Sequence, residues 1–216
     1  MAARHVFTGR RHGDLRSTAE PGALTRARLD VPGVPAAEWT WVDQVHGATV
    51  VVASTPGERA GARADAVVTT EPAVPIAVQT ADCAPLLIEA HGGVAVVHAG
   101  WRGLLAGVVG STFAVLRDLG LTPERAVLGP TIRPRCYEFA GSDLEPLVER
   151  FGPEARSTTG WGTTALDLPA AVRAAVSEHG LALDDVGTCT ACSPDHWSHR
   201  ARGDRERQAL VAWLDG

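Results

Sequence analysis

The stretch VAVVHAGWRGLLAGVVGSTFAVLRDLG, residues 94–120, decides the fold. Val94 to His98 is rich in β-branched residues and predicts a buried strand. The glycines of Gly100-Trp101-Arg102-Gly103 predict a tight turn. From Leu104 to Leu119 apolar residues recur at helical spacing, and Gly120 is placed to end that helix. The stretch therefore predicts a strand, a glycine turn and a helix in succession.

Short β-branched runs bounded by turn residues surround this unit. They predict strands at Trp41 to Val45, Thr49 to Ala53, Ala66 to Thr69, Ile76 to Thr80, Leu86 to Glu89, Ala126 to Leu128, Val186 to Thr190 and Gln208 to Leu214. Helices are predicted at Leu144 to Phe151, capped by Ser142-Asp143, and at Leu168 to His179, ended by Gly180. The pattern of residues 1–36 predicts an edge strand and loops, with a short helix from Leu24 to Leu29. Because strands outnumber helices and cluster early, we expect one mixed α/β domain spanning residues 1–216.

Composition excludes several classes of protein. The chain has 216 residues, of which 45% are hydrophobic and 21% charged, as in an ordinary soluble domain. All 20 basic residues are Arg, which excludes a Schiff-base lysine or a P-loop lysine. The net charge of −5 argues against nucleic acid as a partner. No apolar run approaches the ~20 residues needed to span a bilayer and the start lacks a signal-peptide pattern, so we expect a cytoplasmic protein without a membrane partner.

Three predicted strand ends each carry one candidate metal ligand, namely His46, Cys83 and His98. If these ends converge, their N, S and N atoms form the three-ligand, open-position arrangement of a catalytic zinc site. Two other interpretations stay open: ordinary buried side chains, or a Cys/His pair in a metal-free hydrolase. Copper electron transfer is disfavoured because the usual axial Met is missing, the only Met being Met1.

The neighbouring residues allow a functional and a structural interpretation. The turn containing Trp101 and Arg102 could bind a phosphate at a helix start, or could simply be a tight turn. Trp101 could pack against a flat base or cover the core. Asp82, beside Cys83, could shuttle protons, anchor a ligand or cap a turn.

The C-terminal part contains Cys189 and Cys192, followed by His196 and His199. Only three residues separate the two pairs, whereas a zinc finger separates them by about a dozen, so the spacing argues against a structural zinc site. The arginines that follow alternate with acidic residues, a pattern more typical of a solvated loop than of a phosphate clamp.

Five motifs in order resemble one family: Asp43-Gln44-Val45-His46-Gly47, Ala64-Asp65-Ala66-Val67-Val68, Thr80-Ala81-Asp82-Cys83-Ala84-Pro85, His98-Ala99-Gly100-Trp101-Arg102-Gly103 and Leu128-Gly129-Pro130-Thr131-Ile132. It is the laccase-domain family of purine nucleoside phosphorylases, formerly called polyphenol oxidases. The resemblance implies a catalytic zinc on His46, Cys83 and His98. It also implies two mixed sheets packed face to face with helices outside.

The resemblance implies small-molecule partners, a nucleoside and phosphate. The expected reactions are phosphorolysis of adenosine, inosine, guanosine and methylthioadenosine, and adenosine deamination, although the deaminase H-x-E signature is absent because Ala99 and Gly100 follow His98. Arg10, Arg200 and Arg207 are the phosphate candidates carried over, and Cys136 is taken as structural. The N-terminal glycine-rich loop of the family is trimmed here.

Three alternatives to a phosphorylase remain. Some family members are peptidoglycan editing factors. The implied fold is also similar to that of cytotoxic-factor-type cysteine hydrolases, so a metal-free Cys/His hydrolase acting on a cell-wall precursor is the second alternative. A zinc-binding protein with a vestigial site is the third, motivated by the trimmed loop. The sequence does not predict the oligomeric state.

Overall fold

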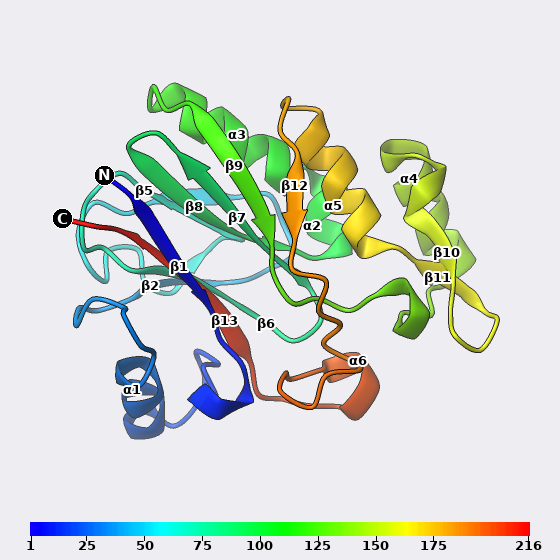
Figure 1. Ribbon diagram of the computed structural model, residues 1–216, viewed down its shortest axis with the longest axis horizontal. Helices are drawn as coiled ribbons and strands as arrows, with labels where there is room; N and C mark the ends of the chain where they lie inside the picture. Colours follow the sequence, from blue (N-terminus) through cyan, green and yellow to red (C-terminus); the bar gives the residue numbers. More distant parts are fainter.

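A six-stranded mixed sheet forms the centre of the molecule in the computed structural model, which describes residues 1–216 (Figure 1). In spatial order its strands are β12 (Leu183–Asp185), β9 (Pro123–Leu128), β7 (Ala84–Ala90), β8 (Gly93–Ala99), β5 (Ala66–Thr69) and β3 (Val50–Val52). The central strands β7 and β8 are antiparallel, whereas the edge strands β12 and β3 pair in parallel with their neighbours. Leu86 and Ile88 face a core shared with helices, while Leu87 faces a second sheet.

The second sheet has five strands. In spatial order they are β1 (Ala3–Phe7), β13 (Gln208–Leu214), β6 (Ile76–Thr80), β2 (Thr40–Asp43) and β4 (Ala62–Arg63). Ile76 and Leu210 of this sheet pack in one buried cluster with Leu87 and Val96 of the first, so the two sheets lie face to face. Ala3 pairs with Leu214, which places the two termini side by side (Figure 1).

Helices cover the outer faces of both sheets. On the six-stranded sheet lie α2 (Trp101–Ala106), α3 (Val108–Asp118) and α5 (Leu168–Ser177), while α4 (Gly141–Phe151) packs beside α5 and α2 (Figure 1). On the five-stranded sheet lies α1 (Pro21–Leu29), whose Leu24 and Ala27 pack with Ala77 and Val211. The remaining elements are α6 (His199–Arg202), the 3-10 turns Arg10–His12, Pro134–Cys136 and Pro153–Ala155, and the hairpin of β10 (Arg156–Thr158) and β11 (Thr164–Leu166). The predicted arrangement of two mixed sheets with helices outside is thus confirmed.

Three local predictions are corrected, and one hairpin was not predicted. The helix predicted from Leu104 to Leu119 is two helices, because Gly107 adopts a φ of 87° between α2 and α3. The helix predicted with a Ser142-Asp143 cap begins at Gly141, after Ala140, with no side-chain cap. The strand predicted at Val186 to Thr190 lies earlier, as β12. The hairpin β10–β11 was not predicted, because its Ser and Thr residues lack an apolar alternation.

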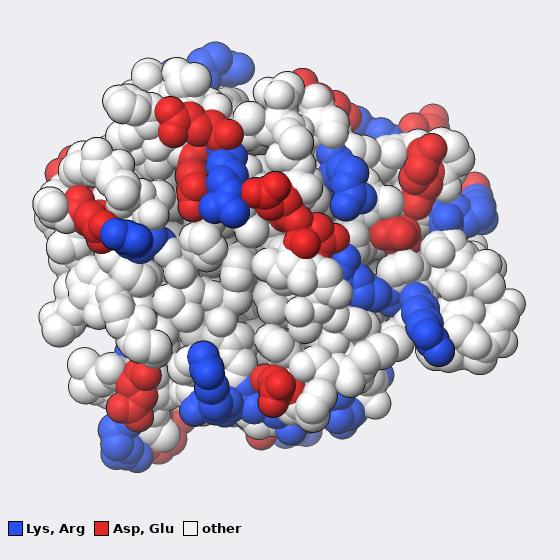
Figure 2. All heavy atoms as spheres, viewed as in Figure 1, with Lys and Arg blue, Asp and Glu red and all other residues white.

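None of the helices combines the length and apolar character required to cross a bilayer. On the face shown in Figure 2, acidic and basic side chains are intermixed. This face offers no broad positive field for a phosphate backbone.

Candidate functional site

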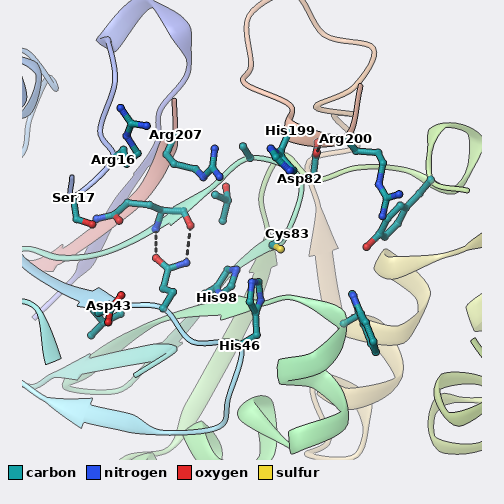
Figure 3. Close-up of a pocket in the computed structure, with 17 residues that line it drawn as sticks. Arg16, Ser17, Asp43, His46, Asp82, Cys83, His98, His199, Arg200 and Arg207 are labelled. Carbon is teal, nitrogen blue, oxygen red and sulfur yellow. Dashed lines mark hydrogen bonds between the residues drawn. The ribbon is translucent and has the colours of Figure 1, made fainter. Parts of the chain in front are cut away.

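His46, Cys83 and His98 meet at one end of the two sheets. His46 follows β2, Cys83 lies in the turn from β6 to β7, and His98 belongs to β8. Their donor atoms all lie within 4.8 Å of one another, and the two imidazole centroids are 4.8 Å apart. His98 is buried, while His46 is exposed at the edge of the group (Figure 3). The structure therefore brings the three predicted strand ends together, in a group that could hold a metal ion.

Gly100 explains why a glycine follows this strand. A Cβ atom at position 100 would lie 2.8 Å from His46 Nδ1 and 3.2 Å from Cys83 Sγ. Both separations are shorter than ordinary van der Waals contacts. The glycine turn therefore leaves room for two of the three donor side chains.

Asp65 organises the group, a role that the sequence analysis missed. Its side chain is fully buried. Oδ1 accepts hydrogen bonds from His98 Nδ1 (2.8 Å) and the His46 backbone N–H (2.9 Å). Oδ2 accepts from the backbone N–H groups of Gly47 (2.7 Å) and Val45 (3.3 Å). An acidic residue at the start of an otherwise apolar strand was the signal available in the sequence, because a buried carboxylate requires partners.

The pKa values of the two histidines are shifted in opposite directions. Burial lowers the pKa of His46, and the nearby His98 lowers it further. Burial also opposes charge on His98, but Cys83 and Asp65 outweigh it and raise the pKa of His98 to about 9. The bond from Nδ1 to Asp65 leaves Nε2 of His98 as the nitrogen that can face a metal ion. Metal binding at neutral pH would displace a proton from this imidazole.

The donor group lines a cavity of about 400 Å3, within the range of about 300–1,000 Å3 typical of small-molecule sites (Figure 3). Trp101 and Tyr137 contribute aromatic surface to the lining. Gln44 and Gln79 also line the cavity and form a pair of hydrogen bonds. The side-chain amide of Gln44 donates to the backbone carbonyl of Gln79 and accepts from the backbone N–H of Gln79, both at 2.7 Å. This contact ties the loop after β2, which carries His46, to strand β6.

The predicted arginines divide into two groups. Arg200 and Arg207 line the cavity, and neither forms an ion pair with a carboxylate. Arg10 does not line it, because its guanidinium pairs with Asp204 at 2.8 Å and packs over the Trp197 ring. Arg102 does not line it either.

The Arg102 guanidinium stacks 4.1 Å from the centroid of the Trp101 ring, outside the cavity lining. Arg16, which the sequence analysis did not select, does line the cavity, from the loop before α1 (Figure 3). Its side chain pairs with Asp14 at 3.3 Å. The N-terminal loop thus contributes a cation that no motif indicated.

Asp82 connects three segments beside Cys83. Its Oδ1 accepts a hydrogen bond from Thr190 Oγ1 (2.7 Å), and its Oδ2 accepts from the backbone N–H of Arg200 (2.6 Å). Its backbone carbonyl accepts from Thr131 Oγ1 (2.6 Å). Asp82 also has a φ of 105°, a left-handed conformation that L residues rarely adopt. These contacts hold the turn that carries Cys83.

Comparison with known proteins gives a consistent result across the chain. The family model described as "Multi-copper polyphenol oxidoreductase laccase" matches residues 9–215. A purine nucleoside phosphorylase from Streptomyces coelicolor is 41% identical over 207 residues, which cover 91% of this chain and 84% of the relative. A purine nucleoside phosphorylase from Mycobacterium tuberculosis is 36% identical over 199 residues, covering 89% and 79%.

Solved structures show the same fold. A DUF152-family protein from Neisseria meningitidis superposes with a TM-score of 0.84 at 26% identity, covering 99% of this chain and 95% of that one. YlmD from Geobacillus stearothermophilus superposes with a TM-score of 0.81 at 25% identity, covering 97% and 85%. The similarity therefore extends over both sheets and their helices.

Proposed function

This chain belongs to the multi-copper polyphenol oxidoreductase laccase family, and from this membership and its cavity we propose that it is a zinc-dependent purine nucleoside phosphorylase. The proposed substrates are adenosine, inosine, guanosine and methylthioadenosine, together with phosphate. One observation carries the proposal: an N, S, N donor group and two guanidinium groups without a carboxylate partner line the same cavity.

We assign the metal site to His46, Cys83 and His98. Two imidazoles and one thiolate match the three-protein-ligand sets of catalytic zinc sites, and the only Met, Met1, does not line the cavity, where it would be needed as the axial ligand of a copper centre. When bound, zinc supplies a Lewis acid that stabilises developing negative charge. Asp65 fixes the ring of His98 through Nδ1, and its bonds to the backbone N–H groups fix the loop that carries His46.

The cavity walls suit the two proposed substrates. Arg200 and Arg207 bind phosphate, because guanidinium groups match phosphate oxygens in charge and geometry, and Arg16 adds positive charge. Trp101 and Tyr137 provide flat surfaces for a purine. A phosphate oxygen then forms a bond to C1′ while the bond from C1′ to the base breaks. The products are the sugar 1-phosphate and the free base, which takes up a proton.

Adenosine deamination in the same cavity is the second activity that we propose. Water adds at C6 of the purine and ammonia leaves, giving inosine. The sequence made Asp82 a candidate proton carrier, but both of its carboxylate oxygens already accept hydrogen bonds. We therefore assign Asp82 to positioning the Cys83 turn and the Arg200 backbone.

A metal-free cysteine hydrolase, acting for example on a cell-wall precursor, is the second candidate. The observation that favours it is the order Asp65, His98, Cys83. The carboxylate orients the imidazole, and the imidazole lies beside the thiol, as in a Cys/His/Asp nucleophilic site. Metal content separates this candidate from the phosphorylase.

The test combines metal analysis with an adenosine assay. We expect adenine release that requires phosphate, that is lost with a chelator and that returns with zinc. His46→Ala should remove one zinc per chain and the activity together. Protein that contains no zinc, releases no adenine and has a Cys83 thiol that reacts with iodoacetamide would instead support the hydrolase. Zinc binding without turnover of any proposed nucleoside would leave a vestigial site.

Arg200→Ala tests the phosphate site. A hydrogen bond between charged groups contributes about 1.5–3 kcal/mol, so its loss should raise the KM for phosphate about 10–100-fold. The zinc content should be unchanged. The backbone bond from residue 200 to Asp82 remains in this variant. Arg205→Ala is the matched control, because Arg205 is exposed and does not line the cavity. An unchanged phosphate KM in Arg200→Ala would remove this residue from the site.

A further inference from the structure

Three cysteines outside the cavity converge on one point. Cys136 ends the 3-10 turn after β9, whereas Cys189 and Cys192 lie in the loop after β12. All three sulfur atoms lie within 4.8 Å of one another, and Cys136 Sγ is 3.1 Å from Cys192 Sγ. His196 and His199, which follow in sequence, are not part of this group. The fold therefore replaces the rejected Cys/His combination with a set of three thiols.

Zinc–sulfur bonds of about 2.3 Å place two sulfurs about 3.8 Å apart in a tetrahedral site. The 3.1 Å between Cys136 Sγ and Cys192 Sγ is shorter than this, so these two sulfurs must move apart by small side-chain rotations to share one ion. All three sulfur atoms are already within 4.8 Å of one another, which is close enough for such rotations to bring them onto one ion. Cys189-Thr190-Ala191-Cys192 is a Cys-x-x-Cys turn, which the Ser193 N–H closes by donating to the Cys189 carbonyl at 2.9 Å. Cys192 is exposed, so an ion can enter from solvent.

We propose that Cys136, Cys189 and Cys192 form a second metal site, which binds a thiophilic ion such as Zn2+ or Cu+ through three thiolates. Soft thiolate donors select these ions over Mg2+ or Ca2+. Three converging thiols favour a metal over a disulfide, which would use two sulfurs and leave the third without a partner. The site is separate from the His46 group and does not depend on the proposed function.

The location suggests what the metal would do. Tyr137, directly after Cys136, lines the cavity, and Thr190, directly after Cys189, donates its hydroxyl to Asp82. Binding at the three sulfurs would clamp the segment that carries Tyr137 to the loop that holds the Cys83 turn. Arg133 donates to the carboxylate of Asp185 and to the Thr188 carbonyl, and so joins the same two segments. The metal would therefore link the segment that carries Tyr137 to the loop after β12, in addition to the Arg133 contacts, and stabilise one wall of the cavity.

The background His46→Ala separates the new site from the proposed catalytic one. In this background, protein is reduced, stripped of metal and dialysed either with Zn2+ or, anaerobically with a reductant, with Cu+. We expect about one ion per chain, and about none when Cys192→Ser is added. Arg135→Ala is the matched control, since it is an exposed neighbour of Cys136, and it should leave the ion in place. Cobalt substitution should give sulfur-to-metal charge-transfer absorption that Cys192→Ser removes.

Two results would overturn the inference. One is a metal content in the His46→Ala background near zero with both ions, or unaffected by Cys192→Ser. The other is a disulfide between Cys136 and Cys192 that persists in the purified full chain with no second ion, shown by peptide mass analysis without reduction. If Cys192→Ser fails to fold, the rate at which a thiol reagent modifies the cysteines of the unmutated chain still tests the proposed site. A bound ion should slow modification of these three thiols, and a chelator should restore it.

Discussion

Asp65→Asn tests how the proposed metal site is organised. Each carboxylate oxygen of Asp65 accepts two hydrogen bonds, one pair from His98 and His46 and the other from Gly47 and Val45. The substitution keeps the shape but places an NH2 group against two donors, whichever way the amide is turned. Two bonds to a charged acceptor are lost, at about 1.5 kcal/mol or more each, so the free energy of unfolding should fall by about 3 kcal/mol.

The same variant should bind zinc more weakly. An unoriented His98 ring and a loosened His46 loop should reduce affinity about 10–100-fold, the range for lost partners of metal-bound histidines. Zinc affinity is measured by competition with a chromophoric chelator, and stability by urea unfolding of metal-free protein. Asp43→Asn is the control, because Asp43 is exposed at the cavity. Unchanged affinity and stability in Asp65→Asn would refute this reasoning.

Three further predictions concern other parts of the chain. Gly100→Ala should weaken zinc binding without removing a ligand, since the added Cβ would press on His46 and Cys83. Gly141→Ala is the control, because a Cβ there meets nothing within 4 Å and zinc affinity should not change. Competition with a chromophoric chelator measures the zinc affinity of both variants. Trp101→Ala should raise the nucleoside KM about 10–100-fold and spare the phosphate KM, as expected for about 1–3 kcal/mol of base stacking, which steady-state kinetics would check. Asp185→Asn should lower unfolding free energy at pH 7 by about 2 kcal/mol. Burial alone would raise the pKa of Asp185, but its contacts with Arg133 outweigh burial and hold the pKa below the ordinary value. The stability that the Asp185 carboxylate contributes is therefore present above about pH 4 and is lost as the pH falls. Urea unfolding at a series of pH values should show the stabilities of the two proteins converging in acid.

Local pattern was sufficient for most strands. Residues Ala66–Thr69, Ile76–Thr80 and Gln208–Leu214 have the predicted bounds, because a short run of buried, mostly apolar residues between turns has few alternatives. The break at Gly107 was harder to predict. The apolar spacing continues through it, and only the left-handed backbone at this glycine separates α2 from α3. Strand β12 was misplaced because its two Asp residues lie at a sheet edge, where polar residues are tolerated.

Contacts between distant segments set the limit for the site. Strand prediction placed His46, Cys83 and His98 at strand ends, but only the family resemblance implied that these three ends meet. The role of Asp65 depends on the loop before Ala48 folding back over β5, which no periodicity encodes. Cys136 and Cys192 are 56 residues apart, and their approach depends on β12 pairing beside β9. Spacing rules use only residues that are close in sequence. They therefore argued against a metal site at Cys189 and Cys192 without taking Cys136 into account.

The cavity takes its metal-binding candidates from strand ends and its arginines from loops and a short helix. The three donor side chains lie at strand ends backed by the packed cores of the two sheets, whereas Arg16, Arg200 and Arg207 come from loops or from the four-residue helix α6. A loop can change its length or move an arginine without disturbing sheet packing, but a donor shifted by one strand residue would point to the opposite face. The N-terminal loop brings Arg16 to the cavity, while Arg10 pairs with Asp204 instead. Changes in this loop should therefore alter substrate preference before they alter metal binding.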